Sequence, residues 1–188
     1  MGLEEKFTLF ITGGSQGAKN LNKVVVELYK ELVEKFDIQI IHQTGEKNYE
    51  ETIAYLNEIY PEYKKNSGII VRPYFEDNAI PMKAADLAIS RAGSLSISEL
   101  HVCALPALLV PYPYAAANHQ LKNAIAAQNI HTAICIEENE VLKENLLKML
   151  SHLIGTPNAL DIMKNAAANC AKPNATKEIC NYLKAICK

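Results

Sequence analysis

Residues 90–99 contain the side chains best suited to hold a phosphorylated ligand, in the order Ser-Arg-Ala-Gly-Ser-Leu-Ser-Ile-Ser-Glu. They directly follow the apolar run 87–89, so the pattern predicts a buried strand, a glycine turn and a new helix. The first N–H groups of a helix lack acceptors within it and attract anions. The amides in question are those of Gly93, Ser94, Leu95 and Ser96. Arg91 could offset phosphate charge, and Glu99 could accept hydrogen bonds from ribose hydroxyls.

Two purely structural interpretations of the same stretch remain open from the sequence. Ser96 and Glu99 have the spacing of a capping box, in which the serine caps the helix and the glutamate returns to the N-cap amide. Arg91 could form an ordinary ion pair with Glu99 or with Asp86.

A second phosphate candidate is the loop 13–18, Gly-Gly-Ser-Gln-Gly-Ala, after the β-prone run 7–12. It is neither G-x-G-x-x-G nor a Walker loop, and the next expected strand ends in His-Gln instead of the acidic residue that would hold an NAD ribose. The pattern therefore argues against a dinucleotide cofactor, and none is expected. Gly14 would let the backbone approach a ligand and the Ser15 hydroxyl could donate to phosphate. The alternative is a tight turn in which Ser15 caps the next helix.

The third group of polar side chains begins at Asn118, a candidate N-cap. His119, Gln120 and Asn123 have the spacing of one helical face and could read sugar hydroxyls, although a solvated first turn would look the same. The sequence contains no D-x-D motif and no His, Cys and carboxylate set with metal-ligand spacing, so no metal is expected. Charge stabilisation would then come from helix N-termini, hydroxyls and Arg91.

Short apolar strands alternating with helices must position these groups. Strands are expected at residues 7–12, 38–43, 68–75, 87–90, 107–110 and 132–136. Helices are expected at 21–36, between Gly45 and Pro61, at 81–85, 96–104, from 118 onwards, and at 141–154, 157–171 and 175–188. This alternation predicts a doubly wound α/β fold, a six-stranded parallel sheet with helices on both faces. Ligands bind such sheets outside the carboxyl ends of the strands, which each polar cluster follows.

Length and composition set the broad class. The 188 residues are 49% hydrophobic, enough for one core, so residues 1–188 are expected to form a single domain. The 19 basic and 21 acidic residues give a net charge of -2 without long like-charge blocks, which argues against a nucleic-acid partner. Five scattered cysteines without a C-x-x-C pair, together with the lack of a signal-peptide pattern or a long apolar run, predict a cytoplasmic location.

Six segments in register resemble the MurG family of bacterial glycosyltransferases, which add N-acetylglucosamine to lipid I in peptidoglycan synthesis. They are residues 13–18, 42–45, 74–77, 91–99, 105–107, and 119–120 with 123–124. The resemblance covers essentially the whole chain but only the C-terminal, Rossmann-like half of the two-domain GT-B fold. It implies that the acceptor half lies outside this chain.

By this resemblance the chain would hold the donor, UDP-N-acetylglucosamine. Ser15 would contact the diphosphate, the Phe75 backbone would read uracil, and Glu99 would hold the ribose. Gln120, with His119, would read the sugar hydroxyls. The helix start that would line the sugar and diphosphate comprises Ser94, Leu95 and Ser96. The family inverts the anomeric carbon by direct attack of the acceptor hydroxyl, and the proposed base belongs to the other half, so no catalytic residue is assigned here.

The resemblance also implies partners and a location. The acceptor half would bring lipid I at the membrane, and the full-length protein would be peripheral on the cytoplasmic face of the inner membrane. Two positions depart from the family pattern: Ala92, where serine is frequent, and Ala117, where an acidic residue is common. Two alternatives remain, a natural half-enzyme that pairs with a separate membrane-attached acceptor subunit, and a nucleotide-sugar-binding module without catalysis.

Overall fold

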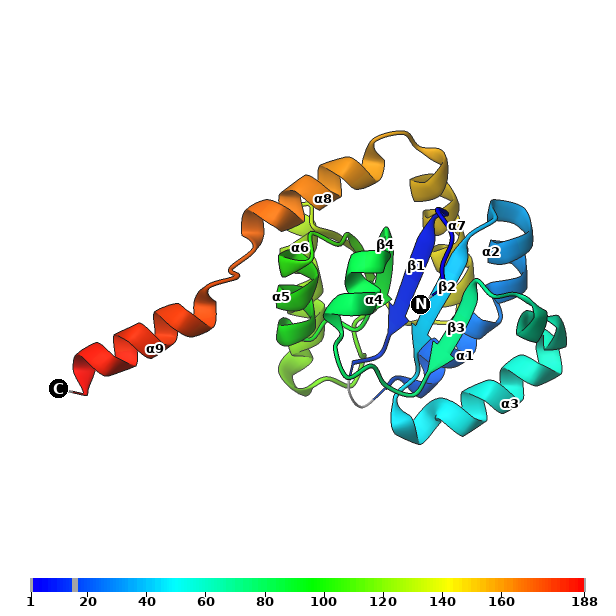
Figure 1. The fold of residues 1–188 in the computed structure, drawn as a ribbon, viewed down its shortest axis with the longest axis horizontal. Helices are drawn as coiled ribbons and strands as arrows, with labels where there is room; N and C mark the ends of the chain where they lie inside the picture. The colour runs from blue at the N-terminus through cyan, green and yellow to red at the C-terminus, as the bar shows by residue number, and fades with distance from the viewer. Residues whose placement is uncertain (1, 15–16, 188) are drawn as a thin grey trace.

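A six-stranded parallel sheet with helices on both faces is seen in the computed structural model, which describes residues 2–14 and 17–187 (Figure 1). The strands are β1 (Thr8–Thr12), β2 (Gln39–Gln43), β3 (Ile69–Arg72), β4 (Leu87–Ser90), β5 (Ala107–Leu109) and β6 (Ala133–Cys135). Their order is β3-β2-β1-β4-β5-β6, and all neighbours are parallel. The order reverses at β1, which confirms the predicted doubly wound fold.

Nine α-helices and three short 3₁₀ turns connect the strands in the described residues. The helices are α1 (Lys19–Val26), α2 (Tyr29–Phe36), α3 (Tyr49–Ile59), α4 (Ala79–Ala84), α5 (Ser94–Val102), α6 (His119–Asn129), α7 (Leu142–Gly155), α8 (Ala159–Cys170) and α9 (Ala175–Ile186). The 3₁₀ turns are η1 (Glu46–Asn48), η2 (Pro61–Lys65) and η3 (Ala116–Asn118).

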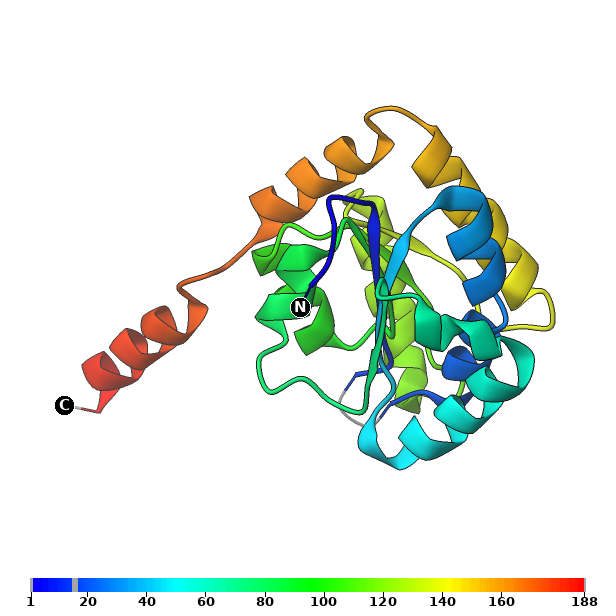
Figure 2. The same ribbon diagram turned by 45° about the vertical axis from the view of Figure 1, so that its right-hand side comes forward.

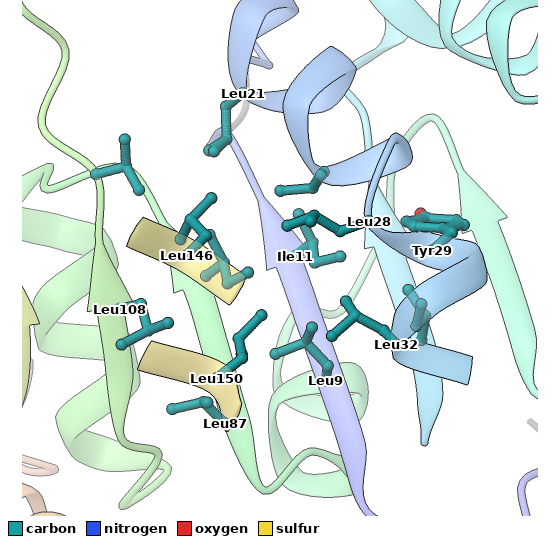
Figure 3. Packing of buried hydrophobic residues seen from close by; sticks show 14 of the residues in the cluster. Leu9, Ile11, Leu21, Leu28, Tyr29, Leu32, Leu87, Leu108, Leu146 and Leu150 are labelled. Carbon is teal, nitrogen blue, oxygen red and sulfur yellow. The ribbon is translucent and has the colours of Figure 1, made fainter. Parts of the chain in front are cut away.

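Helices bury both faces of the sheet, and successive strand residues point to opposite faces. Leu9 and Ile11 of β1 pack with side chains of α1, α2, α3 and α7 on one face (Figure 3). Phe10, between them, packs on the other face with side chains of α4, α5 and α6. The near-continuous apolar runs in the sequence follow from this two-sided burial.

The single helix expected at residues 21–36 is wrong, because two helices occupy this region. The N–H of Leu28 bonds the carbonyl of Val25 at 3.0 Å, so the chain turns more tightly than an α-helix between α1 and α2. This break lets Leu28 and Tyr29 both lie fully buried against the sheet. Core packing therefore overrides a helical periodicity that is continuous in the sequence.

Two other boundaries differ from the expected ones in ways that affect the site. The third strand ends at Arg72 instead of residue 75, since Pro73 has no N–H to donate to a sheet ladder. Helix α5 begins at Ser94, two residues earlier than expected.

The C-terminal helix α9 extends away from the sheet, as Figures 1 and 2 show, and none of its residues is buried. Its apolar side chains Ile179, Tyr182, Leu183 and Ile186 are exposed. Nowhere in residues 2–14 and 17–187 is a helix both long enough and apolar enough to cross a bilayer.

Candidate functional site

A cleft of about 1720 Å³ opens at the carboxyl ends of the strands. It is lined by the loops after β1, β4, β5 and β6, by the first turn of α6, and on one side by α1 and α3. The predicted site residues that line it are Gly14, Arg91, Gly93, Ser94, Leu95, Ser96, His119 and Gln120. Phe75, Glu99 and Asn123 are not among the lining residues, and Ser15 lies outside the described residues. The topology thus brings the three predicted clusters to one place.

The glycine loop after β1 is shaped by three glycines with different roles. A Cβ on Gly13 would lie 2.4 Å from the amide nitrogen of Ala18, and one on Gly17 would lie 2.2 Å from the carbonyl oxygen of Thr44. Gly14 has a φ of +79° but open space where a side chain would be. Gly13 and Gly17 therefore permit close packing within the protein, whereas Gly14 leaves room in the cleft.

The start of α5 presents backbone amides to the cleft. The N-cap is Gly93, without a side-chain capping bond, and the N–H of Ile97 bonds the Gly93 carbonyl at 3.0 Å. The amides of residues 94–96 precede that bond, and their position at a helix N-terminus favours an anion. The capping-box alternative is wrong, because Ser96 is the third helical residue instead of the N-cap. Glu99 is exposed and lies further along the helix.

Arg91 is buried and paired with neither Glu99 nor Asp86, so that alternative is also wrong. Its Nη1 contacts Oε2 of Glu138, from the loop after β6, and donates to the carbonyl oxygens of Val110 at 3.1 Å and Pro111 at 3.3 Å. Asp86 instead accepts a hydrogen bond from the N–H of Thr8 at 2.8 Å. The positive charge of Arg91 is therefore balanced by a carboxylate within the cleft wall.

The first turn of α6 offers groups of opposite hydrogen-bonding character. Oε1 of Gln120 accepts from the N–H of Tyr112 at 3.0 Å, which leaves its amide N–H groups to donate. Nδ2 of Asn123 donates to the Ala92 carbonyl at 3.1 Å, so this residue braces the turn before α5. Nδ1 of His119 donates to the carbonyl of Ala116 at 2.8 Å, which leaves Nε2 for other partners. Gln120 thus lines the cleft with its amide oxygen already engaged.

Asn118 occupies the predicted N-cap position of α6 but does not cap it with its side chain. Its φ is +54°, in the left-handed region, and α6 shows no side-chain capping bond. The position predicted for the helix start is confirmed, and the capping role is wrong.

A row of hydrogen bonds connects the cleft to Phe75, beyond β3. Oγ1 of Thr12 accepts from the N–H of Gly14 at 3.1 Å and from Nε2 of Gln43 at 3.3 Å. Oε1 of Gln43 in turn accepts from the N–H of Phe75 at 2.9 Å. The Phe75 N–H is therefore already engaged within the protein.

His42 of β2 is fully buried, and both of its ring nitrogens have partners within the protein. Its Nδ1 lies 2.7 Å from the Tyr29 hydroxyl and its Nε2 lies 3.1 Å from Oδ1 of Asn22. Nδ2 of Asn22 donates to the Thr44 carbonyl at 2.9 Å, so the Nε2–H tautomer with Tyr29 donating to Nδ1 satisfies every group. Burial lowers the pKa of His42 to about 3, and the ring is neutral. This network holds α1 against β2 behind the glycine loop.

Several residues that line the cleft were not predicted from the sequence. Tyr112 and Tyr114 form an edge-to-face pair with ring centroids 5.6 Å apart, and Tyr114 is 83% exposed. Aromatic residues alternating with prolines directly after a strand could have indicated them. Glu138 and Asn20 had no such signal, because their roles depend on contacts distant in sequence. Within the described part of the chain, no group of three or more His, Cys, Asp or Glu side chains could hold a metal ion.

Comparison with known families gives a match over most of the chain. Residues 8–179 match the model of the glycosyltransferase family 28 C-terminal domain. The chain is also 33% identical over 175 residues to a UDP-N-acetylglucosamine--N-acetylmuramyl-(pentapeptide) pyrophosphoryl-undecaprenol N-acetylglucosamine transferase of Desulforamulus reducens, covering 93% of this chain and 47% of that protein. The transferase of the same name from Caldicellulosiruptor saccharolyticus is 35% identical over 179 residues, covering 95% and 47%.

The fold comparison agrees. The crystal structure of Acinetobacter baumannii MurG superposes with a TM-score of 0.80 at 28% identity, covering 98% of this chain and 54% of that one. The chain spans about half the length of the curated relatives it matches.

Proposed function

Since this chain belongs to the glycosyltransferase family 28 C-terminal domain family, we propose that it is the donor-binding half of an inverting transferase. The donor is UDP-N-acetylglucosamine, and the acceptor is lipid I, the N-acetylmuramyl-(pentapeptide) pyrophosphoryl-undecaprenol in the names of its relatives. The observation that carries this proposal is the single cleft that joins the glycine loop, the start of α5 and Gln120. Residues 1–188 act as one domain.

The diphosphate is held by hydrogen-bond donors and helix ends more than by free cations. Among the described cleft residues, the cations Lys19, Lys23 and Arg91 face four carboxylates, those of Glu51, Glu58, Glu138 and Glu140. Lys19 is paired with Glu51 at 2.8 Å, and Arg91 is paired with Glu138. The amides of residues 94–96 remain for the phosphates, and the family resemblance adds the Ser15 hydroxyl as a further donor. We expect UDP to bind this half weakly and in a salt-dependent manner.

The family resemblance supplies the remaining donor contacts. The Phe75 carbonyl accepts from the uracil ring, Glu99 accepts from the ribose hydroxyls, and Gln120 donates to the sugar. His119 adds a second group at the sugar end, and Asn123 acts behind it through Ala92. These assignments rest on the family resemblance, and of these residues His119 and Gln120 line the cleft.

In the reaction, the acceptor hydroxyl attacks the anomeric carbon, and the bond from that carbon to the diphosphate oxygen breaks. UDP leaves with the bonding electron pair, and the hydroxyl proton passes to a base supplied by the acceptor half. This chain stabilises the negative charge that develops on the leaving diphosphate, through the N-terminus of α5. The acceptor half brings lipid I, so the complete enzyme works at the cytoplasmic face of the membrane.

The experiment is a calorimetric titration of the chain with UDP, UDP-N-acetylglucosamine and, as a control nucleotide, GDP. UDP and the UDP-sugar should bind and GDP should bind far more weakly, because the base edge is read by backbone groups fixed at Phe75. No binding at millimolar UDP would overturn the proposal. Adding a separately expressed acceptor half from a relative then tests for transfer to lipid I, and binding without transfer would indicate a binding module instead.

A further inference from the structure

The wall of the cleft contains a buried ion pair between two loops that are far apart in sequence. The side chains of Arg91 and Glu138 are only 8% and 10% exposed. Glu138 also accepts a hydrogen bond from Nδ2 of Asn20 through its other oxygen, Oε1. Both carboxylate oxygens are therefore engaged, each by a different segment of the cleft.

The ion pair connects the segments that present ligand-binding groups. Arg91 lies two residues before Gly93, the N-cap of α5, and its guanidinium also holds the carbonyls of Val110 and Pro111 at the end of β5. Its Cζ lies 5.5 Å from the centre of the Tyr112 ring. Asn20 belongs to the first turn of α1, directly after the glycine loop. Glu138, directly and through Arg91, thus joins the first turn of α1 to the loops after β4, β5 and β6.

Stability alone gives a poor reason for such a pair. Desolvation of two charges offsets most of their attraction, so a buried ion pair contributes little net stability. A carboxylate also repels an anionic ligand that enters the same cleft. A geometric role accounts for the burial of the ion pair and for the presence of a carboxylate in this cleft. The pair fixes the relative positions of two helix starts that must contact one diphosphate.

We propose that Glu138 is a positioning residue for diphosphate recognition, acting through Arg91 and Asn20. It holds the start of α5 and the start of α1 at the separation that a diphosphate requires, and it keeps Arg91 in the wall of the cleft. This inference rests on the proposed function in taking UDP as the ligand.

The test compares the affinities of uridine and UDP in matched variants. In Glu138→Ala the affinity for UDP should fall about tenfold, whereas that for uridine should change less than about twofold, because only the phosphate-binding segments lose their alignment. Glu138→Gln should recover most of the UDP affinity, since its amide can still bond both partners once the Asn20 amide turns over. Glu140→Ala is the control: it removes an exposed carboxylate from the same cleft and should leave UDP affinity unchanged or slightly higher.

A second variant covers the case in which Glu138→Ala does not fold. Asn20 is exposed, so Asn20→Ala should leave the melting temperature nearly unchanged while lowering UDP affinity about threefold. Where Glu138→Ala folds, that effect should disappear when Asn20→Ala is combined with Glu138→Ala, because Asn20 acts through the carboxylate.

Three outcomes would overturn the positioning role alone: UDP affinity that is unchanged or higher in Glu138→Ala, equal losses for uridine and UDP, or additive effects of the Asn20 and Glu138 changes. Failure of the unaltered chain to bind UDP would overturn the proposed function and this inference together. The two failures are therefore distinguishable in one set of titrations.

Discussion

The backbone N–H of Phe75 donates to Oε1 of Gln43 at 2.9 Å, so a buried side chain of β2 fixes the backbone that follows β3. Nε2 of the same amide donates to Thr12 of β1 at 3.3 Å. Gln43 of β2 thus connects the end of β1 to the backbone that follows β3. The backbone proposed to read the base is therefore held in place by this one amide.

Gln43→Ala should lower the affinities for uridine and for UDP by the same factor, about fivefold or more, because the base end is displaced while the Gly14 N–H keeps its bond to Thr12. It should also lower the free energy of unfolding by about 1–3 kcal/mol, since the N–H of Phe75 loses its acceptor. Titration and urea unfolding measure the two effects.

The matched control is Gln39→Ala, at the other end of the same strand. The Gln39 side chain is also buried and bonds the backbone N–H and carbonyl of Glu4, at 2.8 and 2.9 Å. Its loss should cost similar stability with no effect on ligand affinity. Equal ligand effects in both variants would contradict the role assigned to Gln43.

Glu99→Ala should weaken UDP binding about tenfold while changing the free energy of unfolding by less than about 0.5 kcal/mol. The small stability effect follows because Glu99 is exposed and forms no capping box in this structure. The preference for UDP over 2′-deoxy-UDP should shrink in the variant. A stability loss near 1 kcal/mol with unchanged affinity is the result that a capping role would give, and it would exclude the ribose contact.

Gln120→Ala should abolish the difference in affinity between UDP-N-acetylglucosamine and UDP, since its amide N–H groups are assigned to the sugar. Gln128→Ala is the control on the same helix, because Oε1 of Gln128 accepts from the backbone N–H of Cys135 at 2.9 Å in the same way that Gln120 accepts from Tyr112. Each variant loses one hydrogen bond between a side chain and the backbone. Sugar discrimination that survives in Gln120→Ala would contradict the assignment.

Gly17→Ala and Gly14→Ala should differ strongly in stability although both glycines have positive φ. At Gly17 the new methyl group would lie 2.2 Å from the Thr44 carbonyl, and we expect a loss of about 3 kcal/mol or more. At Gly14 only the left-handed backbone conformation is penalised, by about 1–2 kcal/mol, and the methyl group enters the cleft. Gly14→Ala should therefore be the variant that lowers UDP affinity at a temperature where both are folded.

The pH dependence of stability should include a contribution from His42. Its pKa is about 3 in the folded chain and about 6.5 when unfolded, so between these values the unfolded chain binds the extra proton. Stability should therefore fall by up to about 1.4 kcal/mol per pH unit as the pH drops below about 6.5. His42→Gln should be less stable at pH 7.5, and its deficit should shrink on acidification. Parallel stability curves for the two proteins would contradict this.

Periodicity predicted the doubly wound fold and the common location of the polar clusters because both follow from local patterns. The apolar runs at β1, β2, β4 and β5 mark buried parallel strands, and each cluster directly follows a strand. The topology then brings the clusters together. The resemblance to the family supplied the identity of the ligand and the roles of Ser15, Phe75 and Glu99. These roles remain proposals.

The sequence could not reveal partners that are set by packing in three dimensions. Arg91 pairs with Glu138, 47 residues away, instead of with the nearer Asp86 or Glu99. The break between α1 and α2 accompanies the burial of Leu28 against the sheet, and the apolar stripe of α9 has the pattern of a core face although none of the helix's residues is buried. A helical pattern shows that a face is apolar, but it does not show what covers that face.

The placement of β1 between β2 and β4 also determines when the sheet can form as the chain is synthesised. Leu9 pairs with Ile40 on one side and with Leu87 on the other, a separation of nearly eighty residues. The first three strands can assemble early, but the central strand keeps one open edge until β4 arrives. Non-local pairing of this kind slows folding, so the nascent chain exposes an unpaired apolar edge for longer than a local hairpin protein would. The strand order that creates the ligand cleft thereby also creates a need for protection during synthesis.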